Sequence, residues 1–171
     1  MKPLILFIFT VTALATLVNW TQELKEIKLK IDLPSDSWVL KQYDSANAAT
    51  VYIFKRQPIS DSEGREIVPN VGVIIESIEE GVDIITYTAL KRKQIPFKST
   101  EIFTHEKGQI TFENAIGYRG NYTDNLGLDH TVIVVYGIKA GKGFQVICDS
   151  TTDIFEKVEP EFSSILKSLR E

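Results

Sequence analysis

The residues best suited to chemistry stand near the end of the chain, where the single cysteine, Cys148, is followed directly by Asp149. In an extended strand these two side chains point to opposite faces, and Cys148 shares its face with Phe144 and Val146. A reactive thiolate needs an electropositive, partly exposed setting, which an apolar face does not supply. The pattern therefore predicts a buried structural cysteine and not a nucleophile.

The other candidates for catalysis or metal binding lack the spacing that such sites need. His105 and His130 are far apart in the sequence, with no HExxH motif and no second cysteine, so they form no recognisable zinc set. The acidic residues between 76 and 83 are explained by the start of a helix. The glycines of 137–143 lack the GxGxxG order, and no serine stands in a GxSxG motif. The sequence therefore predicts no enzyme activity, no metal and no cofactor.

Composition places the chain among ordinary globular proteins. It has 171 residues, 43% hydrophobic and 25% charged, which is typical of one domain of mixed secondary structure. The formal net charge is -4, so no broad electropositive surface can neutralise a phosphate backbone, and we expect no nucleic-acid partner. A single cysteine cannot form an intramolecular disulfide, so stability must come from packing.

The first residues of the chain have the pattern of an export signal. Lys2 precedes an apolar run from Leu4 to Val18, which is shorter than the roughly 20 residues that cross a hydrocarbon core. Ala13-Leu14-Ala15 provides a small-x-small cleavage pattern. We therefore expect residues 1–20 to be a cleaved signal peptide, with an uncleaved membrane anchor or a buried helix as alternatives. Residues 21–171 are then expected to form one domain that is secreted, periplasmic or associated with the cell envelope.

Alternating apolar residues and turn signals predict strands along most of this domain, after a polar stretch at 21–26. The strands are expected near 27–33, 38–40, 50–56, 71–78, 98–104, 109–113, 115–122, 130–138 and 143–149. The continuous apolar run Val73–Ile75 predicts a strand covered on both faces. A helix is expected from an N-cap at Asp83 to a point before Pro96. An apolar stripe from Phe155 to Leu169 predicts a terminal helix, which Pro160 should kink or divide into two helices after residue 159.

Two regions supply candidate binding residues. Residues 57–69 form a loop with a proline near each end, and loops of this length are uncommon unless they are mobile or functional. Three tyrosines on neighbouring predicted strands could line a pocket, although packing of aromatic residues in the sheet is the alternative. The candidate residues are Ile59, Asp61, Glu63 and Arg65 in the loop, and Tyr118, Tyr122 and Tyr136 on the strands.

The closing strand, turn and helix carry most of a likeness to a known family. The helix ends in an F-x-x-I-L-x-S pattern at Phe162–Ser168, and a proline and a tryptophan stand in the segment LPSDSWVL at 33–40. From about Lys28 onward the order of elements resembles the Mog1/PsbP-like superfamily. This resemblance implies an α+β fold, an α/β/α sandwich in which helices flank a mostly antiparallel twisted sheet. It also implies use as a binding or assembly module, and the export signal is typical of the exported bacterial members.

The sequence therefore predicts a non-enzymatic interaction or assembly module of the cell envelope or extracellular space, with a protein partner and no cofactor. Contact with a membrane is expected only through an uncleaved N-terminal segment. The alternative is a carrier whose sheet and terminal helix enclose a small apolar ligand.

We predict that protein exported by its own host begins at Thr16 or within a few residues of it, because the cleavage pattern ends at Ala15. N-terminal sequencing of the exported protein, together with its intact mass, measures the cleavage point. Exported protein that still begins at Met1 would instead support the uncleaved anchor.

Overall fold

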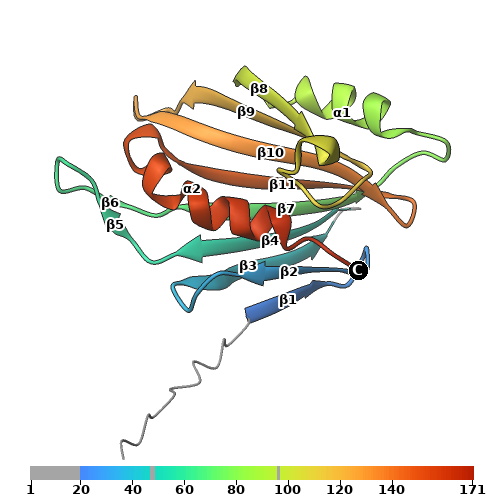
Figure 1. The fold of residues 1–171 in the computed structure, drawn as a ribbon, viewed down its shortest axis with the longest axis horizontal. Helices are drawn as coiled ribbons and strands as arrows, with labels where there is room; N and C mark the ends of the chain where they lie inside the picture. The colour runs from blue at the N-terminus through green and yellow to red at the C-terminus, as the bar shows by residue number, and fades with distance from the viewer. Residues whose placement is uncertain (1–19, 47–48, 96) are drawn as a thin grey trace, which may run out of the picture.

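The computed structural model describes residues 20–46, 49–95 and 97–171 (Figure 1). The predicted export signal therefore lies outside the described residues, apart from Trp20, which begins the first strand. A seven-stranded antiparallel sheet forms the centre of the molecule, with the order β3-β4-β7-β11-β10-β9-β8. Its strands are β3 (Trp38–Ala46), β4 (Ala49–Arg56), β7 (Asn70–Ser77), β8 (Lys98–Thr104), β9 (Ala115–Thr123), β10 (Asp129–Lys139) and β11 (Lys142–Thr151).

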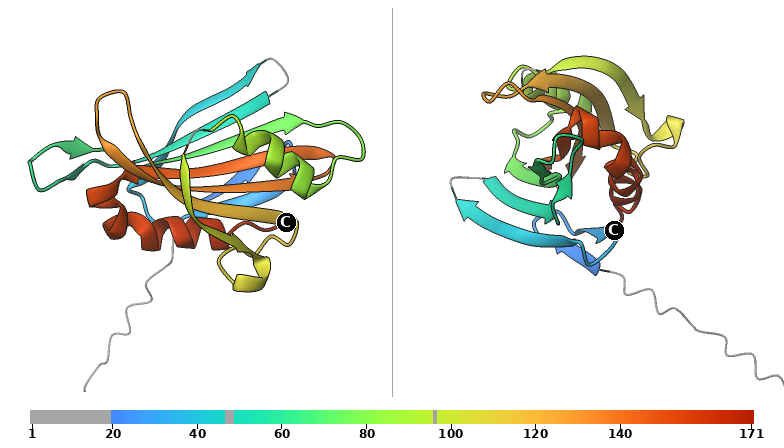
Figure 2. Two further views of the ribbon diagram at one scale, coloured as in Figure 1. Left: turned by 90° about the horizontal axis from the view of Figure 1, so that it is seen from above. Right: turned by 90° about the vertical axis from the view of Figure 1, so that its left-hand side faces the viewer.

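The two helices lie on opposite faces of this sheet. α1 (Ile84–Arg92) contacts β9 and β10, and α2 (Thr152–Lys167) contacts β10 and β11. On the shared strand β10, Val134 belongs to the core beneath α1, whereas Ile133 and Val135 belong to the core beneath α2. Neighbouring side chains of a strand point to opposite faces, so β10 is buried on both. The predicted α+β fold, an α/β/α sandwich around an antiparallel sheet, is confirmed (Figure 2).

α1 begins where the sequence predicted. The carboxylate of Asp83 accepts the backbone N–H of Thr86 at 2.7 Å, which caps the helix. Lys91 and Arg92 form its last turn, where positive side chains complement the helix dipole. In the part of the chain that the structure describes, no helix is long and apolar enough to span a membrane.

The sheet curves around α2, which fills its concave face (Figure 2). The buried residues of this helix are Ile154, Phe155, Val158, Phe162, Ile165 and Leu166. The helix runs without interruption through Pro160, so the expectation of two separate helices is wrong. Pro160 has no N–H for the carbonyl of Glu156, a loss that costs about 3 kcal/mol inside a helix. Buried residues precede and follow Pro160 on one face, and their packing outweighs that cost.

Two short ribbons flank the main sheet. β1 (Trp20–Leu24) pairs with β2 (Leu29–Leu33), so the stretch expected to be only a polar lead-in is in fact a strand. β2 turns Leu29, Ile31 and Leu33 into the core beside α2. β5 (Ile59–Ser60) pairs with β6 (Glu66–Ile67), so the predicted loop 57–69 contains a hairpin.

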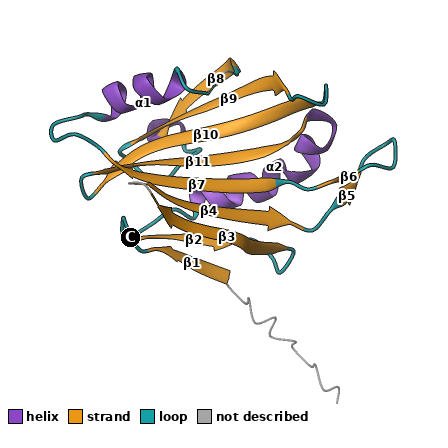
Figure 3. Cartoon of the chain, turned by 180° about the vertical axis from the view of Figure 1, so that it is seen from behind, coloured by secondary structure: helices purple, strands orange, loops and turns teal. Residues whose placement is uncertain are grey.

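Two predicted features of the sheet are wrong. Residues 109–113 form no strand, because they cross the end of the sheet, where Ile110 is buried and the ring of Phe112 packs against Phe144. β7 is covered on one face only, since Val71, Val73 and Ile75 are buried while Ile74 is half-buried. α1 lies over β9 and β10 instead, and Figure 3 shows the strands β4 and β7 from the side away from α2.

A polar contact ties the β3–β4 end of the sheet to α2. The indole Nε1 of Trp38 donates to Glu161 Oε2 at 2.5 Å, and Nε and Nη2 of Arg56 donate to Glu161 Oε1 at 3.1 and 3.0 Å. Trp38 is buried, and the side chains of Arg56 and Glu161 are 21% and 25% exposed. The carboxylate therefore satisfies two donors that have little access to water.

We predict that Glu161→Ala lowers the free energy of unfolding by about 2–4 kcal/mol, because it leaves the indole and the guanidinium without their acceptor. Urea unfolding measures the change. Glu156→Ala is the matched control, since Glu156 is exposed on the same helix, and it should change stability by less than about 0.5 kcal/mol. Equal losses for the two variants would contradict a structural role for the Glu161 contacts.

Candidate functional site

The β5–β6 hairpin extends past the sheet, at the end where β4 stops and β7 begins (Figure 1). Ile59 pairs with Ile67 at its base, and both pack against the core. At its tip, Asp61 accepts the backbone N–H groups of Glu63 and Arg65 at 2.8 Å each, and Arg65 Nε donates to Asp61 at 2.5 Å. Burial opposes ionisation of Asp61, but these hydrogen bonds hold the pKa of its carboxyl below the ordinary value. The predicted loop residues therefore form an ordered tip, in which Asp61 has a structural role.

Two other segments meet this hairpin: the turn between β9 and β10, and the junction of β11 with α2. Together they line an open cavity of about 430 Å³, which we call the loop-end cavity. Its lining includes Glu63 and Arg65 from the hairpin, Leu128 and Asp129 from the turn, and Thr151 and Asp153 from the junction. The cavity brings two of the predicted binding residues together with residues that the sequence did not single out.

The β9–β10 turn presents an exposed leucine beside the cavity. Asp124 Oδ1 accepts the backbone N–H groups of Leu126 and Leu128 at 2.8 and 2.9 Å, and Gly127 supplies the left-handed conformation (φ 82°) that closes the turn. The side chain of Leu126 is held at the tip and is 84% exposed. Leu126 is not among the binding residues predicted from the sequence, and its signal there is an apolar residue between a turn aspartate and a turn glycine.

Tyr122 lies behind this turn, in a cluster around Asp149. Its hydroxyl donates to Asp149 Oδ1 at 3.1 Å, and its ring stacks on His130 with the ring centroids 4.9 Å apart. His130 Nδ1 lies 3.1 Å from the same carboxylate oxygen, and Nε2 lies 3.6 Å from Asp124. Burial and the charge of Asp149 raise the pKa of Tyr122 above its ordinary value. The cluster holds the β9–β10 hairpin against β11.

Tyr118 and Tyr136 lie away from the loop-end cavity, under α1. Tyr136 is fully buried, and burial raises its pKa to about 12. The guanidinium of Arg92 lies 4.0 Å from the ring centre of Phe97 and 5.1 Å from that of Tyr118. The space that these tyrosines were expected to offer a ligand is therefore occupied by an arginine of the chain itself, so the packing alternative describes them better.

Cys148 is 0% exposed, which confirms the predicted burial. Burial raises the pKa of its thiol far above the ordinary value. Among residues 20–46, 49–95 and 97–171, no group of three or more histidines, cysteines or acids is placed to hold a metal ion.

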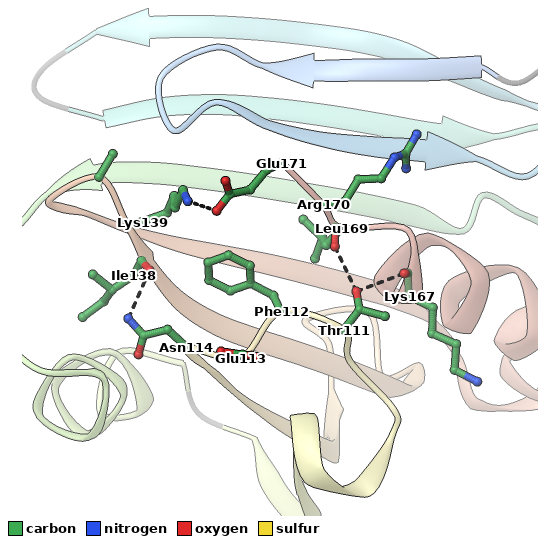
Figure 4. Close-up of a pocket in the computed structure, with 11 residues that line it drawn as sticks. Thr111, Phe112, Glu113, Asn114, Ile138, Lys139, Lys167, Leu169, Arg170 and Glu171 are labelled. Atoms are coloured by element: carbon green, nitrogen blue, oxygen red, sulfur yellow. Dashed lines mark hydrogen bonds and ion pairs between the residues drawn. The ribbon is translucent and has the colours of Figure 1, made fainter.

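A larger cavity, of about 720 Å³, opens at the opposite end of the molecule (Figure 4). Phe112, Ile138 and Leu169 form its apolar surface, and an ion pair between Lys139 and Glu171 crosses one side. This is not the apolar space between sheet and helix that the carrier hypothesis expects. That space is filled by buried side chains, which include Phe54, Phe144, Phe155 and Phe162.

No protein-family model and no curated protein sequence matches the chain. Protein PA94 of Pseudomonas aeruginosa, of unknown function, matches in structure with a TM-score of 0.58 and 16% identity, over 90% of this chain and 96% of that chain. LpqN of Mycobacterium tuberculosis, involved in cell envelope biogenesis, matches with a TM-score of 0.54 and 16% identity, over 88% of each chain. At these identities the similarity shows the fold alone. The α+β fold around a mostly antiparallel sheet, which the sequence resemblance implied, is confirmed.

We predict that Cys148 does not react with Ellman's reagent in the folded protein, because its thiol is buried and protonated. One thiol per chain should react after unfolding in guanidinium chloride, and the absorbance of the released product measures both states. Rapid labelling of the folded protein would show that the strand opens or that the thiol is accessible.

Proposed function

We propose that the chain is a non-enzymatic interaction module of the cell envelope or extracellular space, which binds a protein partner through its loop end. The loop end comprises the β5–β6 hairpin, the β9–β10 turn and the junction of β11 with α2. The observation that carries this proposal is the exposed Leu126, held on an ordered turn whose next two residues, Gly127 and Leu128, line the loop-end cavity.

An exposed leucine alone is ordinary on a protein surface. Leu126 differs because the two hydrogen bonds to Asp124 fix the backbone that presents it. Because this backbone is already ordered, a partner that buries Leu126 has to order only its side chain, so preorganisation contributes to affinity. Burying a leucine side chain stabilises a complex by about 1.5–3 kcal/mol, and the neighbouring cavity offers further contact area.

The arrangement of polar residues supports a role without catalysis. His130 has a carboxylate near each ring nitrogen, with Asp149 at Nδ1 and Asp124 at Nε2. In a nucleophilic triad one of these nitrogens faces a hydroxyl or thiol instead. The buried thiol of Cys148 points away from Asp149, on the opposite face of β11.

Two observations support a place in the envelope. The predicted export signal would carry the domain out of the cytoplasm. LpqN, which shares the fold, is described as taking part in cell envelope biogenesis. Fold alone does not determine function, so the location depends chiefly on the signal.

We predict that a photo-crosslinking amino acid at position 126 captures one main protein partner in the living host, and that the partner is recovered in stoichiometric amount. The same amino acid at position 85 is the matched control, because Ile85 is also exposed (70%) but lies on α1, away from the loop end. Mass spectrometry of the crosslinked bands measures both. A partner captured from position 85 and not from 126 would place the interface elsewhere and overturn the proposal.

A further inference from the structure

The solvent-facing side of α1 is apolar. Ile85 and Leu90 are 70% and 52% exposed, and Thr86 and Ala89 are exposed beside them. With 3.6 residues per turn, these four positions lie on one side of the helix. Within α1, all of which the structure describes, no exposed residue is charged. Figure 1 shows this helix at the margin of the molecule, away from the hairpin at the loop end.

The side of α1 that faces the sheet is polar instead. Its fully buried positions are Tyr87 and Thr88. The hydroxyl of Tyr87 donates to Glu76 Oε1 at 2.8 Å, and Lys91 Nζ donates to Glu76 Oε2 at 2.6 Å. A surface helix ordinarily turns its apolar residues to the core and its charged residues to water, so α1 has its two sides reversed.

α2 shows the ordinary arrangement in the same molecule. Its exposed residues include Asp153, Glu156, Lys157 and Lys167, and its large apolar residues are buried. The reversal is therefore a property of α1 and not of the whole surface. Adjacent apolar side chains held outward by a helix are typical of a surface that another molecule covers.

Opposite charges lie at the two ends of this apolar side. Glu79 and Glu80 come shortly before the helix, and Lys93 follows directly after it; all three are exposed. If two copies of α1 lie side by side in opposite directions, the acidic end of each helix meets the basic end of the other. The two helix dipoles are then also opposed, which is favourable. The surface is thus complementary to itself under a two-fold rotation.

This charge pattern favours a second copy of the chain over a membrane. A helix that lies on a bilayer has lysine or arginine on its polar side, because these residues attract anionic lipids. Glu79 and Glu80 would instead be repelled by the same headgroups. The small side chain of Ala89, near the middle of the exposed side, allows a second helix to approach closely.

We propose that two copies of the chain associate through antiparallel α1 helices, with Ile85 and Leu90 of each copy buried against the other. The contact lies away from the loop end, so both copies remain able to bind a partner. A helix of 9 residues offers a small contact area, and the association is therefore weak and depends on concentration.

The direct test is analytical ultracentrifugation of the protein purified from its own host, from micromolar to millimolar concentration. The protein should pass from monomer to dimer over this range. Ile85→Gln combined with Leu90→Gln should raise the dissociation constant at least about tenfold, because the two central apolar side chains are removed. The matched control is Leu40→Gln combined with Val68→Gln, two residues that are each 40% exposed and lie outside α1, and it should stay within about twofold. Circular dichroism shows whether each variant is folded.

Reversing the charges tests the antiparallel orientation. Glu79→Lys combined with Glu80→Lys should weaken self-association about threefold or more at low salt, and so should Lys93→Glu, because each change places like charges at both ends of the contact. An equimolar mixture of these two variants should associate about as tightly as the unmodified protein, since opposite charges then meet again. Variants that associate as the unmodified protein does, or a mixture without recovery, would contradict the antiparallel contact.

The crosslinking amino acid at position 85 tests the same contact in the living host. It should give a band of twice the chain's mass that contains this chain alone, which mass spectrometry distinguishes from a foreign protein. Three results would overturn the proposal: a monomer at millimolar concentration, equal association of the unmodified protein and the Ile85→Gln, Leu90→Gln variant, or a monomer that binds phosphatidylglycerol vesicles through these two residues. None of these results affects the loop-end proposal, which depends on capture from position 126.

Discussion

The burial of one face of α2 in the curved sheet is the interaction on which the rest of the structure depends. Its stripe of phenylalanine and aliphatic side chains joins residues of β4, β7, β10 and β11 in one continuous core. β2 closes this core from the other side of the helix, and Arg170, just after α2, pairs with Asp32 of β2 at 2.6 Å. The concave face is largely filled by the protein's own side chains, and the two cavities described above lie at the ends of the sheet.

The antiparallel topology explains why three segments far apart in the sequence meet at one end. β4 and β9 finish there, and β7 and β10 begin there. The connection from β4 to β7 and the turn from β9 to β10 therefore lie next to each other. β11 ends at the same end of the sheet, so the first turn of α2 lies beside them. Ends of sheets expose loops that packing does not constrain, so they can carry recognition residues with little effect on the fold. The hydrogen bonds of Asp61 and Asp124 within their own turns are what keep these two connections ordered.

Much of the fold was predictable, because strands and helices with one buried face repeat apolar residues at a regular spacing in the sequence. The alternation of β4 and the cap at Asp83 are local signals, and both were identified correctly. β1 was missed because only Leu24 of its five residues is buried, which leaves no alternation to detect. The sequence could not show that α2 continues through Pro160, because the packing of the buried face of this helix against the sheet decides it. The site was harder still, because the association of Arg65, Leu126 and Thr151 depends on how distant segments meet, and the filling of the tyrosine region by Arg92 depends on where α1 docks.

The β5–β6 hairpin has a further consequence for engineering. Its tip is held by contacts between Asp61 and its own near neighbours, and only Ile59 and Ile67 at its base pack against the core. Because the tip is stabilised mainly by its own hydrogen bonds, we expect that it can be replaced while the rest of the fold is kept. Its tip can be exchanged for another hairpin of matching base width, so the same sheet and helix can serve as a scaffold that displays foreign peptides.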